Sequence, residues 1–273
     1  MTHSARSAEV ESVKTRLKAM WMAGDYDRFS RYMESNAREF YERLDVAPGC
    51  QFLDVGCGSG KLALVAAKDG LNVTGVDIAG NLVERARVRA QAEGLTVRFE
   101  EADAEALPFE DANFDVVASL IGAMFAPQPD LVAKELLRVC VPGGTLAMAN
   151  WTPQGFVGQM FKTVSTFIAP VGMPSPVLWG DETTVRERLS KGLSEIHLTR
   201  RHFTFSYPFP PSEVVECYRL YYGPTNQAFA SLDAGGRERL RQELEALWSL
   251  HNRAGSDCTV VLAEYLEVIG IRT

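Results

Sequence analysis

Three glycines at alternate positions form a loop directly after a short apolar segment. The run is Asp54-Val55-Gly56-Cys57-Gly58-Ser59-Gly60, and a Leu/Ala-rich segment follows at 61–68. Glycine lets the backbone approach a ligand without a Cβ clash, and the N-terminus of a following helix offers free N–H groups to an anion. The loop therefore predicts a site for a nucleotide-like ligand.

Two common nucleotide-binding motifs do not fit this loop. A dinucleotide fingerprint requires a small residue at the position of Lys61. A P-loop requires glycine at the position of Val55 and Ser or Thr at the position of Leu62. Lys61 thus argues against an NAD-dependent oxidoreductase, which stays open as an alternative.

Two more carboxylates follow the next apolar segments. Asp77 ends the second segment and matches an acid that accepts both ribose hydroxyls at the carboxyl edge of a parallel sheet. Asp103 follows the third segment, where a carboxylate is placed to accept from an adenine amino group. Each carboxylate alone is compatible with a solvated turn, but carboxylates at three successive strand ends indicate a binding site.

The elements that position these residues are short strands alternating with helices. Strict alternation predicts an α/β fold with a doubly wound, mostly parallel sheet and helices on both faces. Two later segments, 196–207 and 259–271, are expected to be long strands that pair antiparallel. The other strands are expected at 51–55, 73–77, 96–100, 114–119 and 145–150, and the helices between them at 61–68, 81–92 and 130–139.

The chain has 273 residues, a length that an elaborated α/β domain reaches as one unit. We expect a single domain, 1–273, in three parts. Residues 1–48 form an N-terminal helical cap, 49–153 a ligand-binding core, and 154–273 a second half with a helical insert at 208–253. The cap is expected to hold two helices with a break at Gly24-Asp25, and the insert a helix at 234–251 that buries Leu240, Leu244, Leu247 and Leu250.

Composition excludes several classes of protein. The 28 basic and 35 acidic residues give a net charge of −7, which disfavours a nucleic-acid partner. No apolar run approaches the ~20 residues of a membrane-spanning helix, and charges through residues 6–18 leave no signal-peptide core, so we expect a cytoplasmic protein without a membrane span. The five cysteines lack CxxC spacing, so neither a disulfide framework nor a metal site is expected.

Four segments occur in an order and spacing that resemble the class I S-adenosylmethionine-dependent methyltransferases. They are LDVGCGSG, VTGVDIAGNLVERAR, EADAEALPFEDANFDVV and ELLRVCVPGGTLAMANW, and they cover about residues 50–153. The chain is most similar to the small-molecule branch with ubiquinone/menaquinone-type (methyltransferase type 11 like) enzymes. The resemblance implies a seven-stranded Rossmann-like sheet, S-adenosyl-L-methionine as cofactor and S-adenosyl-L-homocysteine as product.

The resemblance also implies roles for individual residues. The methionine part of the cofactor would lie in the glycine loop, and its ammonium beside Asp54. Asp77 would hold the ribose, and a Tyr26-containing helix stands where related enzymes close the cofactor, although core packing is our interpretation of Tyr26. The full set of cofactor-binding candidates is Asp54, Gly56, Cys57, Gly58, Gly60, Asp77, Ile78 beside the adenine, Asp103 with the Ala104 N–H at the adenine edge, and Ser119 with Leu120 below the cofactor.

Methyl transfer from a sulfonium is an in-line displacement that depends on positioning more than on acid catalysis. The segment 121–126 after the fourth strand is apolar, without ligands for a catalytic metal or a nucleic-acid methylation motif. We therefore expect a small, largely apolar acceptor methylated at O, N or C. No catalytic residue is assigned, and the candidates for a general base are His202, Tyr222, His251 and Glu264, of which both histidines are interpreted as structural or surface residues.

The insert at 208–253 is expected to be a lid that forms the acceptor pocket with the N-terminal helices, with Tyr221 and Tyr222 closest to a ligand. The alternatives are that the insert only covers the sheet or makes a dimer contact. Monomer and homodimer both stay open. A binding module that retains the cofactor site without methyl transfer is the remaining alternative to an enzyme.

Overall fold

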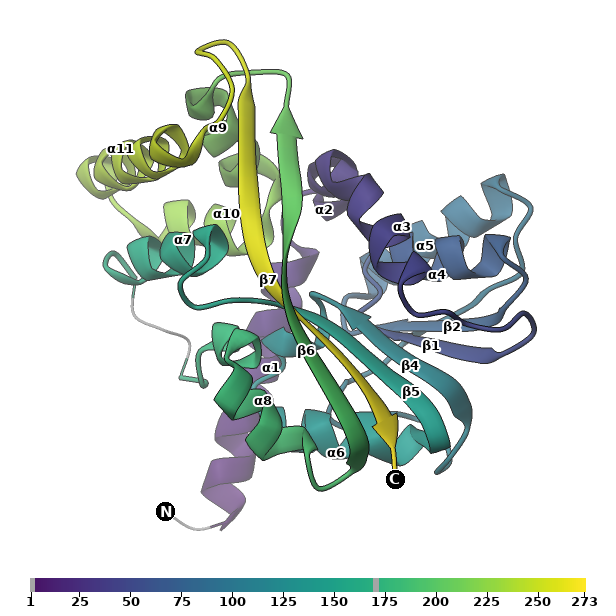
Figure 1. Cartoon of the computed structure of the whole chain (residues 1–273). Coiled ribbons are helices and arrows are strands. Elements are labelled where there is room, and N and C mark those ends of the chain that lie inside the picture. The colour runs from purple at the N-terminus through teal and green to yellow at the C-terminus, as the bar shows by residue number, and fades with distance from the viewer. Residues whose placement is uncertain (1–2, 169–171) are drawn as a thin grey trace. The chain divides into compact units, whose positions relative to one another are not determined.

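The computed structural model describes residues 3–168 and 172–273, and within them seven strands form one sheet in the order β3-β2-β1-β4-β5-β7-β6 (Figure 1). Strands β1 to β5 pair in parallel, and β7 pairs antiparallel with β5. This arrangement confirms the expected doubly wound, mostly parallel sheet. The strands are β1 Gln51–Val55, β2 Asn72–Asp77, β3 Arg98–Glu101, β4 Phe114–Leu120, β5 Cys140–Trp151, β6 Leu193–Tyr207 and β7 Thr259–Arg272.

Helices precede the sheet, connect its parallel strands and fill the interval between β6 and β7. The α-helices are α1 His3–Met22, α2 Tyr26–Ser30, α3 Glu34–Glu42, α4 Lys61–Lys68, α5 Gly80–Ala92, α6 Pro129–Val139, α7 Phe156–Ser165, α8 Glu182–Leu189, α9 Pro211–Tyr221, α10 Gly223–Ser231 and α11 Ala234–His251. Short 3-10 helices are η1 Arg31–Met33, η2 Ala123–Phe125 and η3 Pro176–Gly180.

The chain divides into two compact units, each made of several segments. Unit 1 comprises Met1–Met33, Pro153–Met173 and His202–Glu264, and unit 2 comprises Glu34–Thr152, Pro174–Arg201 and Tyr265–Thr273. This division cuts across the expected cap, core and second half. The reason is that the N-terminal helices separate: α1 packs with α10 and α2 with α9, whereas α3 packs with α4.

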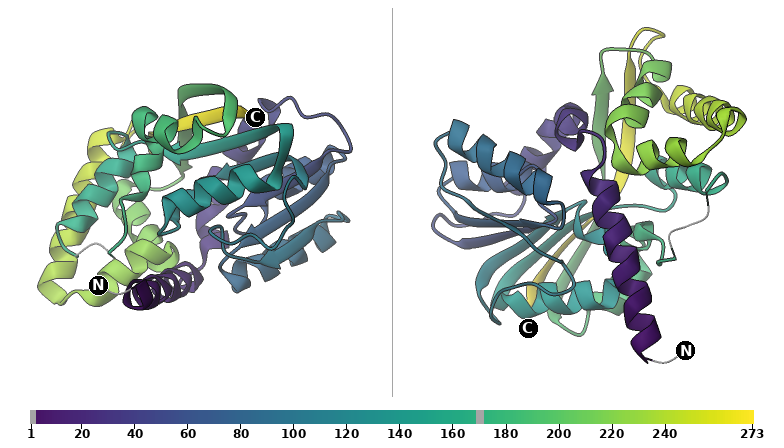
Figure 2. Two further views of the ribbon diagram at one scale, coloured as in Figure 1. Left: turned by 90° about the horizontal axis from the view of Figure 1, so that it is seen from below. Right: turned by 180° about the vertical axis from the view of Figure 1, so that it is seen from behind.

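Unit 2 contains the parallel part of the sheet with helices on both faces. Helices α3, α4 and α5 cover one face, and α6 and α8 cover the other (Figures 1 and 2). The strands are apolar runs that lie between these layers, and Phe52, Leu53 and Val55 of β1 are fully buried. Apolar segments buried on both faces are characteristic of parallel strands.

Unit 1 has an aromatic core at the junction of α7, α9 and α11. The rings of Phe156 and Trp248 lie 4.4 Å apart, and those of Tyr218 and Trp248 lie 5.2 Å apart, both edge-on. Helix α11 buries Leu240, Leu244 and Trp248, whereas Leu250 is 78% exposed. The expected burial of Leu250 was therefore wrong, and Leu247 is only half-buried, because Trp248 occupies the core position in the last turns of the helix.

Backbone crossings join the start of the chain to the insert within unit 1. The Asp25 N–H donates to the Tyr221 carbonyl at 3.2 Å, and a Cβ on Gly223 would lie 2.0 Å from the Met20 carbonyl oxygen. Tyr26 packs edge-on against Trp21 with ring centroids 5.9 Å apart, in agreement with its interpretation as a packing residue. Both the break at Gly24-Asp25 and the bend at Gly223 thus lie where two chain segments touch.

Several element boundaries differ from those expected. Strand β5 begins at Cys140 and includes Pro142-Gly143-Gly144, which was expected to be a turn. The sequence predicts a helix at 152–168, and the structure has the shorter α7 there; no separate helix is predicted at the position of α10. The sequence also predicts a proline-rich loop at 170–179, and its first two residues lie outside the described residues.

Candidate active site

The glycine loop leaves the carboxyl end of β1 in a tight turn. Gly56, Gly58 and Gly60 have φ values of 74°, 53° and 84°, in the left-handed region that other residues rarely adopt. The N–H groups of Gly56 and Cys57 both donate to the Val76 carbonyl at 2.8 and 2.9 Å. The turn is therefore fixed against the end of β2, and it leads directly into α4.

Asp77 connects the end of β2 to this loop. Its Oδ2 accepts from the Gly58 N–H at 2.9 Å, and its Oδ1 accepts from the Ala79 N–H at 2.8 Å. Burial is the main influence on its pKa and raises it above the usual range of an aspartate. A carboxylate has about four acceptor positions, so Asp77 retains the capacity to accept from two ribose hydroxyls while the backbone holds it.

Asp54 is 1% exposed at the end of β1. Its Oδ2 accepts from the Ala63 N–H in the first turn of α4 at 3.1 Å. Burial raises the pKa of Asp54 to about 7, and the neighbouring charge of Asp77 adds to the increase. A buried carboxylate of this kind is suited to a cationic group, which would favour its charged form.

A second backbone crossing supports the glycine loop from the side of β4. A Cβ on Gly56 would lie 2.6 Å from the Gly122 Cα, and a Cβ on Gly122 would lie 2.4 Å from the Gly56 carbonyl oxygen. Neither position has room for a side chain. Gly122 was not among the predicted site residues, and its only signal in the sequence was a glycine inside an apolar segment.

Ser119 is buried near the end of β4, and its hydroxyl forms hydrogen bonds with two backbone groups. Its hydroxyl donates to the Val55 carbonyl at 2.7 Å and accepts from the Ala123 N–H at 2.9 Å. Ile121, two residues later, has a φ of 64°, which is unusual for a β-branched residue and marks local strain. Ser119 and the half-buried Leu120 thus shape the floor beside the loop, and direct contact with the cofactor stays a prediction for both.

Asp103 and Ala104 lie in a tight turn after β3, at the same sheet edge. The Asp103 carboxylate accepts from the Glu105 N–H at 2.9 Å, and the Asp103 backbone carbonyl accepts from the Ala106 N–H at 3.0 Å. Glu105 is buried and accepts from both the backbone N–H and the side-chain amide of Gln128, at 2.6 and 2.7 Å. Glu105 therefore ties the Asp103 turn to the start of α6.

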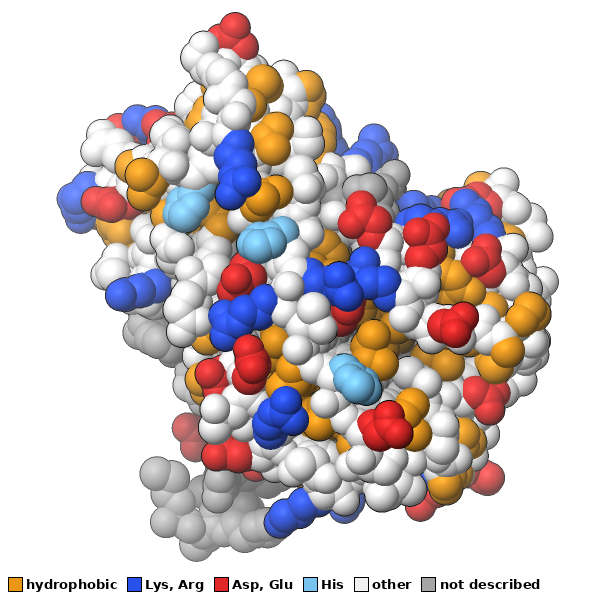
Figure 3. Space-filling view, in the orientation of Figure 1, with side chains coloured by type: hydrophobic (Ala, Val, Ile, Leu, Met, Phe, Trp, Pro, Cys, Tyr) orange, Lys and Arg blue, Asp and Glu red, His pale blue; other side chains and the backbone are white. Residues whose placement is uncertain are grey.

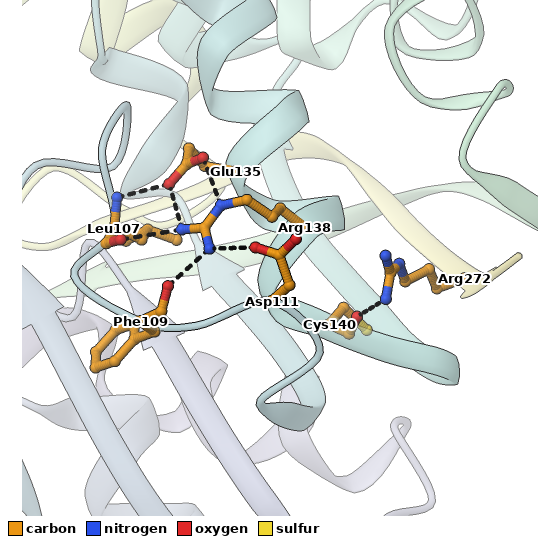
Figure 4. A network of polar contacts seen from close by, with 7 residues as sticks. All are labelled: Leu107, Phe109, Asp111, Glu135, Arg138, Cys140 and Arg272. Carbon is orange, nitrogen blue, oxygen red and sulfur yellow. Dashed lines mark hydrogen bonds and ion pairs between the residues drawn. The ribbon is translucent and has the colours of Figure 1, made fainter.

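Arg138 holds the rest of this loop (Figure 4). Its guanidinium donates to the carbonyls of Phe109 and Leu107 at 2.7 and 3.0 Å. It also pairs with Asp111 at 2.9 Å and Glu135 at 2.7 Å. These carboxylates raise the pKa of Arg138, and Arg138 lowers the pKa of Glu135. This clamp was not predicted, and its only signal in the sequence is an Arg three residues after a Glu on a helix.

All of the predicted cofactor-binding residues belong to unit 2, and the four candidates for a general base belong to unit 1. His202 is exposed, and the His251 ring nitrogen lies 3.1 Å from the Gln159 side-chain oxygen, as expected for surface and structural residues. Burial raises the pKa of Tyr222. No cluster of metal-ligating side chains occurs in the described residues, and no helix among them is long and apolar enough to span a membrane.

The residues at the carboxyl edge of the parallel strands are suited to bind S-adenosylmethionine. Three glycines in the left-handed region have no Cβ that would obstruct a ligand. The Asp77 carboxylate can accept further hydrogen bonds, and the hydrogen bond of the buried Asp54 carboxylate in the described structure is to a backbone N–H. The roles of individual residues stay predictions. The arrangement can bind an adenosine with an attached amino acid.

Comparison with known proteins assigns a methyltransferase domain to the segment that contains the glycine loop and the three carboxylates. A family model described as a methyltransferase domain matches residues 53–148. An uncharacterized protein of Mycobacterium tuberculosis is 36% identical over 248 residues, which are 90% of each chain. The methyltransferase GfsG of Streptomyces halstedii is 42% identical over 134 residues, 48% of each chain.

A solved structure shares the fold. Phosphoethanolamine N-methyltransferase 2 of Haemonchus contortus, crystallised with S-adenosylhomocysteine, has a TM-score of 0.57 at 19% identity. The match covers 87% of this chain and 52% of that one. The methyltransferase family model and the methyltransferase relative support S-adenosylmethionine as the cofactor and argue against the NAD-dependent alternative.

Proposed function

Because the chain belongs to the class I S-adenosylmethionine-dependent methyltransferases, we propose that it methylates a small, largely apolar organic acceptor at oxygen, nitrogen or carbon. The observation that carries the proposal is Asp77, which two backbone N–H groups hold at the end of β2 beside the glycine loop. This is the position from which a carboxylate accepts both ribose hydroxyls.

The chain's residues would act mainly by positioning. Asp77 would orient the ribose, Asp54 would attract the ammonium, and the Asp103 turn would read the adenine edge. When bound, the cofactor supplies an electrophilic methyl group. Orientation of two reactants at contact distance contributes about 7 to 11 kcal/mol in favourable cases, which is why no nucleophile or metal of the protein needs to be assigned.

Side chains near the carboxyl end of β4 favour an apolar acceptor. Ala123 and Met124 of η2 are buried, and half-buried Leu120 and Phe125 flank them. Ligand sites are mostly apolar with few polar groups. An acceptor with an apolar body would exclude water from the sulfonium, which favours transfer to the acceptor over solvolysis.

We further propose that the partner is a small molecule rather than a nucleic acid, and that the protein acts in the cytoplasm as a monomer or homodimer. The net charge is −7, and in Figure 3 basic and acidic side chains are interspersed over the described part of the face shown. The five cysteines are free, which suits a reducing compartment.

Titration calorimetry with S-adenosylhomocysteine tests the cofactor site. Asp77→Ala is expected to weaken binding by about 2 to 4 kcal/mol, because two charge-assisted hydrogen bonds of about 1.5 to 3 kcal/mol each are partly replaced by water. Asp69→Ala is the matched control, since Asp69 lies outside the glycine loop and pairs with Arg38 at 3.6 Å and with the Tyr41 side chain. Equal affinity of wild type and Asp77→Ala would contradict the assignment of Asp77 to the ribose.

A further inference from the structure

Unit 2 has four buried nitrogen donors without a hydrogen-bond partner within the described part of the chain, and three of them are grouped around the end of β5. These three are the indole Nε1 of Trp179, the guanidinium Nη1 of Arg188 and the amide Nδ2 of Asn150. Trp179 and Asn150 are each 1% exposed. Buried donors are almost always paired in native structures, so each exception calls for a physical reason.

Trp179 and Arg188 form a pair. The guanidinium carbon of Arg188 lies 4.6 Å from the centre of the Trp179 ring, in cation–π contact. Trp179 belongs to η3 and Arg188 to the last turn of α8, and the Asp181 side chain caps α8 between them by accepting from the Thr184 N–H at 2.9 Å. The short connection therefore holds the indole and the guanidinium together.

This pair lies beside the end of β5. A Cβ on Gly180 would lie 2.1 Å from the Trp151 carbonyl oxygen, so η3 packs directly on the strand end. Trp179 precedes Gly180 and Asn150 precedes Trp151, so both unpaired donors adjoin the same backbone contact. Helix η3 also packs against η2, which directly follows Gly122.

The charge of Arg188 and the donor character of the three unpaired atoms determine which ligand this group of residues can bind. Burial is the main influence on the pKa of Arg188 and lowers it, and Asp130 and Glu187 attract the guanidinium only through space. An arginine remains charged at neutral pH, and all three unpaired atoms are donors. Their complement is an acceptor-only anion, and a planar carboxylate matches a guanidinium with two parallel hydrogen bonds.

We propose that Trp179 and Arg188, with Asn150 beside them, bind a carboxylate of the methyl acceptor. This inference rests on the proposed function, because it assigns the bound acid as the acceptor. The carboxylate would serve as a handle that orients an apolar body along the β4 and β5 ends, while the methyl group goes to another atom of the molecule.

Nuclear magnetic resonance on the ¹⁵N-labelled full chain with S-adenosylhomocysteine tests the site. The chain has four tryptophans, and loss of one indole signal in Trp179→Phe assigns the Trp179 resonance. The probes are acetate, benzoate and hexanoate, each with its neutral amide. At least one carboxylate should move the Trp179 indole proton downfield in a saturable manner, and its amide should bind at least ~10-fold more weakly.

Variants separate recognition from structure. Arg188→Gln should weaken the carboxylate at least ~10-fold, and Arg188→Lys should give an intermediate loss because the charge remains but the planar fork is gone. Arg186→Gln, which removes an exposed charge from the same helix, should leave binding unchanged. Melting temperatures verify that each variant is folded, and Arg188→Lys carries the test if Arg188→Gln does not fold.

Three results would overturn the inference: no carboxylate moves the Trp179 resonance, the amides bind as tightly as the acids, or the Arg188 variants bind as the wild type does. Calorimetry of S-adenosylhomocysteine is the independent readout. Normal cofactor binding with no carboxylate response contradicts this site alone. Absent cofactor binding contradicts the proposed function, whatever the carboxylates do.

Discussion

The backbone N–H of Gly58 donates to Oδ2 of Asp77 at 2.9 Å, so the glycine loop and the end of β2 hold each other in place. The same carboxylate accepts from the Ala79 N–H at the start of the next helical segment. One side chain thus fixes the two backbone turns between which a ribose would lie. Preorganisation of this kind reduces the ordering cost of binding.

Gly58→Val is expected to abolish cofactor binding and to lower stability. Gly58 has a φ of 53°, which is strained for any β-branched residue. Titration with S-adenosylhomocysteine and urea unfolding give the two readouts. Gly58→Asn serves as the comparison, because Asn tolerates the left-handed region and should retain more stability. Normal binding by a folded valine variant would mean that the loop is only a turn.

Gly122→Ala is expected to destabilise the protein by about 1 to 3 kcal/mol, the range for forcing an extra methyl group into a packed site. The added Cβ would lie 2.4 Å from the Gly56 carbonyl oxygen, so the glycine loop must move and cofactor affinity should fall. Gly255→Ala is the matched control, since its Cβ would meet nothing within 4 Å. Urea unfolding of both variants measures the difference, and equal stability would contradict the crossing.

Arg138→Gln is expected to lower the free energy of unfolding by about 2 to 3 kcal/mol, because the guanidinium loses its bonds to four residues and the largely buried Glu135 loses its cation. It should also weaken S-adenosylhomocysteine binding, since the clamped segment 107–111 follows the Asp103 turn. Arg219→Gln breaks a comparable pair with Glu216 on the solvent side of α9, where both side chains are partly exposed, and should cost less than about 1 kcal/mol. If the two variants unfold at the same urea concentration, Arg138 does not act as a clamp.

The sheet and its cofactor edge could be predicted because local signals agree there. Strand β1 is a short apolar run that ends in glycines, and both β1 and α4 have the expected bounds. The carboxylates Asp54, Asp77 and Asp103 follow from their places at the ends of parallel strands, which share an edge.

Features that depend on contacts between distant segments could not be predicted. The Gly56–Gly122 crossing and the Arg138 clamp join residues that are far apart in the sequence, and no local sequence motif marks these residues as contact partners. The assignment of α1 and α2 to unit 1 and of α3 to unit 2 could not be predicted either, because it depends on which distant helices they pack against. Trp179 has no distinguishing signal in the sequence, because an unpaired indole N–H is visible only once its surroundings are known.

The pKa of about 7 at buried Asp54 predicts a pH dependence of stability. An aspartate in the unfolded chain has a pKa near 3.9, so between about pH 4 and pH 7 the folded protein binds more protons than the unfolded one. The contribution of Asp54 to stability is therefore fully present below about pH 4 and is lost as the pH rises to about 7. The loss is on the order of 2 to 4 kcal/mol.

Asp54→Asn isolates this effect, because the amide does not titrate and its oxygen can still accept from the Ala63 N–H. Urea unfolding from pH 4.5 to 7.5 should show a decline in the wild type that is much smaller in the variant. A cationic ammonium beside Asp54 would favour the charged carboxylate, so cofactor binding near pH 6 should release a proton from the wild type and less from the variant. Calorimetry in buffers of different ionisation enthalpy measures that release. Identical pH profiles and identical proton release in the two proteins would show that Asp54 is already ionised and does not hold the ammonium.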